Sequence, residues 1–180
     1  MTRHPVATRV MAAALFVALA LLVLLVKLVP VDLGGQTRLA APDLLLCLVL
    51  AWAIRRPDLL PLPLIAAVML LADLVLLRPP GLWAGLVVLA TEWLRRRQRP
   101  LRAQAFALEW AMVGAVMVVL AVAQWGVLAV MVVQQPTLGQ QLLQVPVTLA
   151  AYPLVVVALH LGAGIRKRPA IVGFGRGAQT

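Results

Sequence analysis

The sequence has no serine, no asparagine, one cysteine (Cys47) and only two histidines, His4 and His160. Without serine, the chain has no nucleophile for serine intramembrane proteolysis. One cysteine and two histidines far apart in the sequence cannot supply the ligands of a Cys/His zinc cluster. A lone cysteine forms no internal disulfide, so we interpret Cys47 as a small apolar residue within its apolar run. These absences exclude much catalytic and metal chemistry.

Charge is also scarce, because only 12% of the residues are charged while 63% are hydrophobic, giving a mean hydropathy of +1.00. A soluble core of this length could not bury so much apolar surface. A helix that crosses a hydrocarbon layer of about 30 Å needs roughly 20 apolar residues. The 180 residues therefore suit about six crossings with short loops. We predict an all-α polytopic membrane protein, with residues 1–180 forming a single transmembrane domain.

Apolar runs bounded by charge or proline predict helices at residues 10–29, 40–54, 59–77, 81–94, 106–133 and 141–163. We interpret the first as an uncleaved helix, because the run is long and no clear small-residue cleavage site follows it. The second and fourth runs would cover only about 21 to 23 Å as helices, so either could instead be re-entrant. Residues 164–180 are predicted to form a basic, glycine-rich cytoplasmic tail.

The basic residues lie mainly in alternate loops, which is typical of membrane topology. If all six helices cross and the N-terminus is cytoplasmic, the cytoplasmic side holds Arg3, Arg9, Arg55, Arg56, Arg95, Arg96, Arg97, Arg99, Arg102, Arg166, Lys167, Arg168 and Arg176. Only Lys27, Arg38 and Arg78 fall outside. We therefore predict that both termini are cytoplasmic. The net charge of +10 then reflects topology, and no nucleic-acid partner is expected.

Acidic residues inside apolar runs are candidate functional residues, because burying a charge is costly. Asp73 is the strongest candidate, near the outer end of the third helix, with Arg78 as a local partner. We interpret it as a helix-locking residue, with contact to a partner or ligand as the alternative. Asp43 follows Pro42 at the start of the second helix, where capping and function are both open. Glu109 begins the fifth helix, so the helix-end argument applies to it too.

A basic cluster follows the fourth helix and comprises Arg95, Arg96, Arg97, Arg99 and Arg102. It can bind anionic lipid headgroups or an acidic partner, although its role in setting topology needs neither. Glu92 precedes Arg95 and Arg96 by three and four residues, which is the spacing of ion pairs on one helix face. Small residues at four-residue spacing allow close helix packing, and they are Ala14 and Ala18, Gly81 and Gly85, and Ala107, Ala111 and Ala115.

Residues 42–97 contain a series of short motifs. It comprises Pro42-Asp43-Leu44 opening the second helix, Trp52 and Arg55-Arg56-Pro57 closing it, Asp73-Leu74 in the third, and Pro80-Gly81-Leu82 opening the fourth. In order and spacing these motifs resemble the MreD family of rod shape-determining membrane proteins. Length, helix number and the arginine-rich loop after the fourth helix agree. One departure is that Leu76, Leu77 and Arg78 replace the small residues expected after the third-helix acid.

The resemblance implies a non-enzymatic scaffold in the bacterial inner membrane that helps to maintain rod cell shape, without a cofactor or metal. Its implied partners, besides membrane lipids, are an MreC-like single-pass protein, a RodA-like glycosyltransferase with its penicillin-binding transpeptidase and, indirectly, MreB. Asp43 and Asp73 would then be structural or interface residues. One alternative is the substrate-capture subunit of an energy-coupling-factor vitamin transporter, which MreD-like proteins resemble in size and helix number. Another is a lipid-handling enzyme that uses Asp73 or Glu109.

Overall fold

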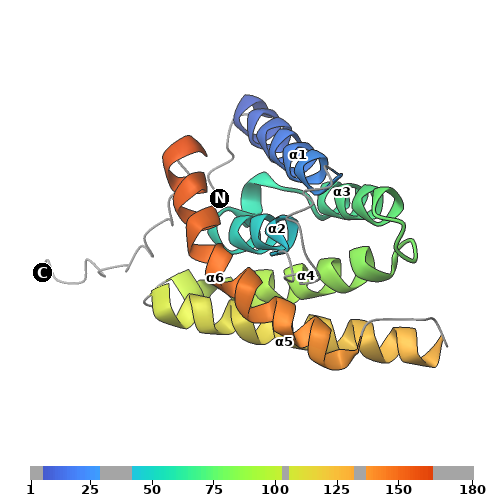
Figure 1. The fold of residues 1–180 in the computed structure, drawn as a ribbon. Helices are drawn as coiled ribbons and strands as arrows, with labels where there is room; N and C mark the ends of the chain where they lie inside the picture. The colour runs from blue at the N-terminus through green and yellow to red at the C-terminus, as the bar shows by residue number, and fades with distance from the viewer. Residues whose placement is uncertain (1–5, 29–41, 103–105, 132–136, 164–180) are drawn as a thin grey trace, which may run out of the picture.

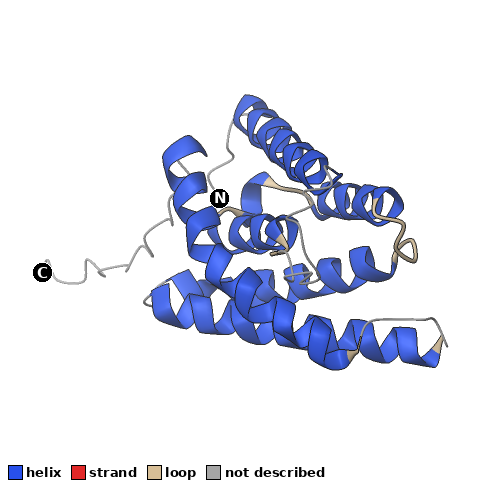
Figure 2. Cartoon of the chain, in the orientation of Figure 1, coloured by secondary structure: helices blue, strands red, loops and turns tan. Residues whose placement is uncertain are grey.

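The computed structural model describes residues 6–28, 42–102, 106–131 and 137–163 (Figure 1). This part of the chain is helical and contains no strand (Figure 2). Its six α-helices are α1 (Val6–Leu28), α2 (Leu44–Arg55), α3 (Leu62–Val75), α4 (Leu82–Arg102), α5 (Phe106–Val130) and α6 (Leu138–Ala163). A short 3-10 helix, η1 (Pro57–Leu59), lies between α2 and α3. The all-α class and the six helices are confirmed.

Parts of four sequence-based predictions lie outside the described residues. These parts are the last residue of the first run, residues 40 and 41 of the second, residues 132 and 133 of the fifth, and the tail 164–180. The prediction that both termini are cytoplasmic also concerns residues outside the described part.

The first and sixth helices start before their predicted first residues, at Val6 and Leu138, and α2 starts only at Leu44 because Asp43 is its cap. The third and fourth differ most in length from their predictions. The third was expected at residues 59–77, but α3 has only 14 residues, because Pro57 opens η1 and Pro61 is extended at φ −69° and ψ 143°. Proline cannot donate a backbone N–H within a helix, so α3 starts after this segment. The fourth was expected to end at residue 94, but α4 continues through the basic cluster to Arg102. Arginine and glutamine are good helix formers, and the apolar pattern ends before the helix does.

The centre of the bundle is α2, in which every residue from Leu45 to Arg55 is buried. It contacts α1, α4 and α6, while α3 packs on α4 and α1, and α5 packs on α4 and α6 (Figure 1). Trp52 of α2 meets Phe16 of α1 edge to face, with 5.5 Å between ring centroids. The first residues of α2, α4 and α6 and the last residues of α1, α3 and α5 lie at the same end of the bundle. We call this end of the bundle the Asp43 end, and the opposite one the Glu109 end.

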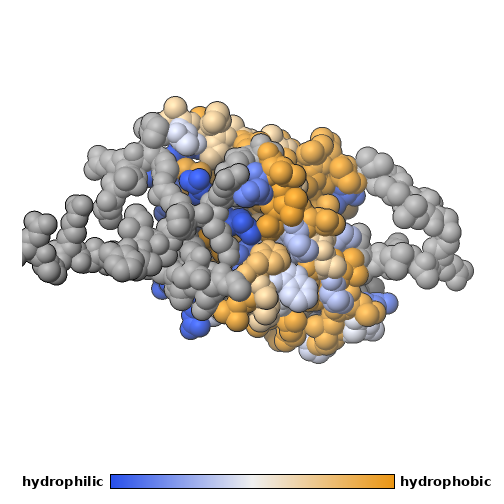
Figure 3. All heavy atoms as spheres, turned by 90° about the vertical axis from the view of Figure 1, so that its left-hand side faces the viewer, coloured by the Kyte–Doolittle hydropathy of each residue, from blue (hydrophilic) through white to orange (hydrophobic). Residues whose placement is uncertain are grey.

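Among the described residues, three segments are long and apolar enough to cross a membrane, namely Ala7–Leu28, Phe106–Val130 and Leu138–Leu161. Large apolar side chains point outward from these helices, among them Met11, Val119 and Leu154. Figure 3 views the Glu109 end, where hydrophilic residues lie among hydrophobic ones. The shorter helices α2 and α3 have 12 and 14 residues. Long helices with outward-facing apolar side chains indicate a membrane protein.

Close packing between α5 and α6 depends on a tryptophan and a glycine. Pro153 lies inside α6 and cannot donate to the carbonyl of Leu149, four residues earlier. Trp110 of α5 supplies the missing donor, because its Nε1 lies 3.0 Å from that carbonyl oxygen. A Cβ on Gly114 would lie 2.9 Å from Cδ2 of Leu149, so the glycine allows α5 to approach α6 closely.

Candidate functional site

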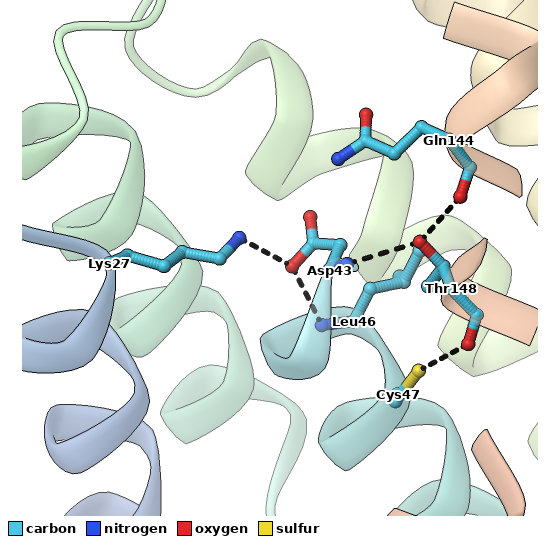
Figure 4. Close-up of polar contacts among 6 residues, drawn as sticks. All are labelled: Lys27, Asp43, Leu46, Cys47, Gln144 and Thr148. Carbon is cyan, nitrogen blue, oxygen red and sulfur yellow. Dashed lines mark hydrogen bonds and ion pairs between the residues drawn. The ribbon is translucent and has the colours of Figure 1, made fainter. Parts of the chain in front are cut away.

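Asp43 joins three helices at the start of α2 (Figure 4). Its Oδ1 accepts a hydrogen bond from the N–H of Leu46 at 3.3 Å and lies 2.9 Å from Nζ of Lys27, near the end of α1. The N–H of Asp43 donates to Oγ1 of Thr148 in α6 at 3.1 Å. An acidic residue at this position satisfies a free N–H and complements the positive end of the helix. Asp43 is thus a helix cap that also bonds to two neighbouring helices.

Thr148 forms the polar contact between α2 and α6. Its hydroxyl donates to the carbonyl of Gln144 at 2.8 Å, while its own carbonyl accepts from Sγ of Cys47 at 3.3 Å. Cys47 is buried, as expected for a small apolar residue, but it also donates to this backbone oxygen. Sequence reasoning missed Thr148, although a hydroxyl inside an apolar run is a signal that it bonds to another helix.

Asp73 is completely buried at the end of α3, and its carboxylate binds the start of α4. Its Oδ2 accepts from the N–H groups of Gly81 and Ala84 at 3.1 and 3.0 Å. The expected ion pair with Arg78 does not form. Arg78 meets Asp73 through a backbone bond of 2.9 Å, and its guanidinium lies 5.9 Å from the ring centroid of Trp83. The carboxylate instead accepts hydrogen bonds from the free N–H groups at the start of α4, because they are closer and carry positive helix-end charge.

The turn from α3 to α4 contains a leucine in the left-handed conformation, Leu77, with a φ of 53°. The N–H of Leu77 donates to Leu74 at 3.3 Å, and the N–H of Arg78 donates to the carbonyl of Asp73. These two bonds form a Schellman motif, in which glycine usually occupies the left-handed position. The tight turn therefore forms although larger residues replace the small ones. Leu77 is 93% exposed.

A cavity of about 370 Å³ lies beside these groups at the Asp43 end. Its polar lining residues are Asp43, Arg78, Trp83, Gln124, Gln141, Gln144 and Thr148. Nε1 of Trp83 and Oε1 of Gln141 are buried there without a hydrogen-bond partner among the described residues. Cavities of this size with a few convergent polar groups suit small ligands.

Glu109 is completely buried near the start of α5 and bonds to two other helices. Its Oε1 accepts from the hydroxyl of Tyr152 in α6 at 2.8 Å and lies 3.3 Å from Nη2 of Arg55 in α2. Removing two charges from water is costly, and the tyrosine bond helps to offset that cost. The sequence predicted a helix-end role for Glu109, but neither of these contacts. The lone tyrosine inside an apolar run was the available signal.

The basic cluster makes three different kinds of contact. Arg95 donates to the carbonyl of Leu60 at 2.6 Å. Arg96 pairs with Glu92 at 3.0 Å, which confirms an ion pair at the predicted spacing. The guanidinium of Arg97 lies 4.6 Å from the ring centroid of Trp93. Arg99 and Arg102 belong to α4, but their side chains lie outside the described part.

The glycines of the small-residue pattern do not mark a close helix contact. Nothing described lies within 4 Å of a Cβ added to Gly81 or Gly85. Gly81 is instead required by the backbone conformation, because its φ of +86° is unfavourable for any residue with a Cβ. Among the glycines that the structure describes, Gly114, which the pattern missed, is the one at a close contact.

The alanines of the pattern in α5, Ala107, Ala111 and Ala115, are exposed. Two of them, Ala111 and Ala115, line an apolar groove of about 760 Å³ between α4 and α5. Its other lining residues are Leu86, Leu89, Ala90, Trp93, Leu108, Met112, Val116, Val119, Leu120 and Ala123. We call this the α4–α5 groove.

Within residues 6–28, 42–102, 106–131 and 137–163, no group of three or more histidine, cysteine or acidic side chains could hold a metal ion. Asp43, Asp73 and Glu109 lie on different elements, and each is bonded to its own donors. The structure thus offers a polar cavity at one end and an apolar groove along one side. No protein-family model matches the chain, and no curated protein or solved structure is significantly similar to it.

Proposed function

We propose that the chain is a non-enzymatic scaffold subunit of the bacterial cell-wall elongation machinery, the role that its MreD-like motifs imply. In this proposal it lies in the inner membrane with six crossings and both termini in the cytoplasm. It binds an MreC-like single-pass protein and, through it, a RodA-like glycosyltransferase with its penicillin-binding transpeptidase.

The α4–α5 groove is the observation that carries the proposal. On α5 it runs from Leu108 to Ala123, a rise of about 23 Å, which is most of the length of a membrane-spanning helix. Ala111 and Ala115 form part of its floor and are exposed. Small side chains let the backbone of a second helix approach closely, and this packing drives helix association in lipid. We therefore assign the groove to the single membrane-spanning helix of a partner.

The distribution of charge supports the proposed topology. Arg9 and Arg95 line the same cavity at the Glu109 end, and Arg55 is buried at that end. Lys27 and Arg78 lie at the Asp43 end. Cytoplasmic ends of membrane helices are enriched in arginine and lysine, so the Glu109 end is assigned to the cytoplasm.

The acidic residues support a role without catalysis. The carboxylate of Asp73 caps α4, that of Asp43 caps α2, and that of Glu109 pairs with Arg55. A catalytic acid needs access to a substrate, whereas Asp73 and Glu109 are completely buried.

The test is to purify the C-terminally tagged full-length protein from its native cells in mild detergent and identify the co-purifying proteins. An Ala111→Leu/Ala115→Leu variant fills the groove. An Ala14→Leu/Ala18→Leu variant is the matched control, since these alanines are exposed on α1 at the same spacing. We expect MreC-like and RodA-like proteins with the wild type and the control, and their loss with the groove variant. Recovery of an energy-coupling ATPase module would contradict the scaffold role.

The cavity at the Asp43 end favours one second candidate, a substrate-capture subunit. Trp83 and Gln141 line this cavity with Arg78, and each has a buried polar atom without a hydrogen-bond partner among the described residues. Such convergence is what a capture subunit requires. Native mass spectrometry of the freshly purified protein separates the two functions. A bound metabolite that is lost in Arg78→Gln would support capture, and a ligand-free protein that retains its membrane partners would support the scaffold.

A further inference from the structure

A second cavity, of about 440 Å³, lies at the Glu109 end, opposite the one described above. We call it the Arg9–Arg95 cavity. Its walls come from the start of α1, from η1 and the residues after it, and from α4. The residues that line it are Arg9, Val10, Ala13, Pro57, Asp58, Leu59, Leu60, Pro61 and Arg95.

Positive charge prevails around this cavity. Arg9 is exposed, and Arg95 is fixed by its bond to the carbonyl of Leu60. Nε of Arg95 is buried without a hydrogen-bond partner among the described residues, and so is Nε of Arg56, next to Pro57. Asp58 is the one carboxylate in the lining, and it is exposed to solvent. Two arginines against one exposed acid favour an anion, and guanidinium groups bind phosphate oxygens especially well.

In the proposed membrane topology, the residues around the cavity place it at the depth of lipid headgroups. Arg9 immediately precedes the apolar stretch of α1, and Arg95 immediately follows that of α4. Trp93, two residues away, is exposed and stacked under Arg97, a position typical of the membrane interface. This placement holds whichever side of the membrane the Glu109 end faces.

The remaining lining is apolar, which points to an amphiphilic ligand. Val10 and Ala13 form one wall, and the outward-facing Val10 and Met11 continue as an apolar surface along α1. A free phosphate compound would gain nothing from this surface, whereas acyl chains would bury it. We propose that the Arg9–Arg95 cavity binds the phosphate-bearing headgroup of an anionic phospholipid, with the acyl chains lying along α1. The inference does not depend on the scaffold function, because it uses a different part of the molecule.

The test is equilibrium lipid binding to the purified full-length protein, followed by native mass spectrometry. The probes are phosphatidylglycerol and phosphatidylcholine with identical acyl chains. We expect phosphatidylglycerol to bind more tightly, and Arg9→Gln to weaken its binding about fivefold, as expected for one basic residue near an anionic surface. Arg96→Gln is the matched control, because Arg96 is exposed at the same end but lies outside the lining of the cavity, and it should weaken binding less than Arg9→Gln.

Three outcomes would overturn the proposal. Equal binding of the two lipids would remove the headgroup preference. Equal losses in Arg9→Gln and Arg96→Gln would show a general charge effect rather than a site. Displacement of phosphatidylglycerol by soluble glycerol phosphate at equal concentration would show a phosphate site that does not recognise a lipid. Arg9 is exposed, so its substitution tests binding without disturbing the Arg95 bond to Leu60.

Discussion

Individual residues show how this chain keeps charge away from lipid. Glu109 accepts from Arg55 and Tyr152, while Asp73 accepts from the backbone N–H groups of Gly81, just before α4, and Ala84, in its first turn. In both cases the donors lie in or next to other helices, so neutralising the charge also fixes the position of a neighbouring helix. In a membrane this coupling replaces much of the hydrophobic driving force that holds a soluble core together.

Substituting Arg55 by methionine should strongly destabilise the protein. The change leaves the Glu109 carboxylate buried beside an apolar side chain, so we expect a loss of about 3 kcal/mol or more in unfolding free energy. Thermal unfolding in detergent measures it. Arg96→Met is the control, because its pair with Glu92 is exposed and should contribute less than about 1 kcal/mol. Equal losses in the two variants would contradict the assigned role of the buried pair.

Leu77→Gly should stabilise the protein, by about 0.5 to 1 kcal/mol, because glycine adopts the left-handed conformation without strain. Leu70→Gly is the matched control, since Leu70 is also exposed but lies inside α3. There glycine should cost about 1 kcal/mol. Thermal unfolding should show a gain in stability for Leu77→Gly and a loss for Leu70→Gly. A destabilised Leu77→Gly would mean that the exposed leucine side chain makes a stabilising contact.

The sequence predicted part of this residue-level picture. Capping by Asp43 was one of two roles that its position after Pro42 left open, and the structure shows the cap. A cap can be suggested by sequence because it depends on neighbours in the chain. The partners of Glu109 lie 54 and 43 positions away, and no local pattern relates them. The pairing of Asp73 with Arg78 was a local inference, and it failed because the N–H groups of α4 compete for the same carboxylate.

At the scale of helices, three residues determine the geometry of the α3–α4 hairpin. The backbone of Gly81, the carboxylate of Asp73 and the left-handed Leu77 together bring α4 back against α3. This hairpin also supplies Arg78 and Trp83 to the cavity at the Asp43 end. The geometry of the turn therefore positions part of the candidate ligand site.

Two glycines of α4 and its entry should respond oppositely to alanine. Gly81→Ala forces an alanine to a φ of +86°, so we expect a loss of about 1 kcal/mol. Gly85→Ala adds a methyl group to open space inside the helix and should gain about 0.5 to 1 kcal/mol. The unfolding temperatures of the two variants test this. A loss of similar size in both would indicate that Gly85 packs closely against another helix.

Helix positions were predictable because apolar runs in this sequence are interrupted by charge and proline. The residues at which the helices begin and end were less predictable. Prolines shortened α3, and the arginines after residue 94 extended α4, since charge ends a membrane span without ending a helix. The close α5–α6 contact at Gly114 was not predicted, because a single glycine carries no repeat pattern.

At the scale of the whole molecule, a short buried helix is surrounded by longer ones. The 12 residues of α2 rise about 18 Å, less than the thickness of the hydrocarbon layer. The surrounding helices cover α2 on every side, because all residues from Leu45 to Arg55 are buried. A helix shielded in this way need not match the membrane thickness, so its polar ends can lie within the bundle.

The proposed topology places the two ends of α4 on opposite sides of the membrane. Single cysteines replacing Leu77 and Arg96 test this, with the wild type as control because Cys47 is buried. A membrane-impermeant maleimide applied to spheroplasts should label Leu77→Cys but not Arg96→Cys, and both after lysis. Labelling of both positions in intact spheroplasts would place the two ends of α4 on one side.

The class of the molecule was predictable from composition, because so apolar a chain has no soluble alternative. The number of helices followed from the runs. The cavities and the α4–α5 groove were not predictable, since they depend on how far helices separate, and side-chain volumes across several helices decide that distance.

The most direct test of the scaffold proposal is site-specific photocrosslinking in native cells. A photoreactive amino acid replaces Ala115 in the α4–α5 groove, and in a second strain it replaces Leu154, which is exposed on α6 outside the groove. The account predicts that position 115 crosslinks to a single-pass membrane protein while position 154 does not. Crosslinking to that protein from both positions alike, or from neither, would contradict the assignment of the groove to a partner helix.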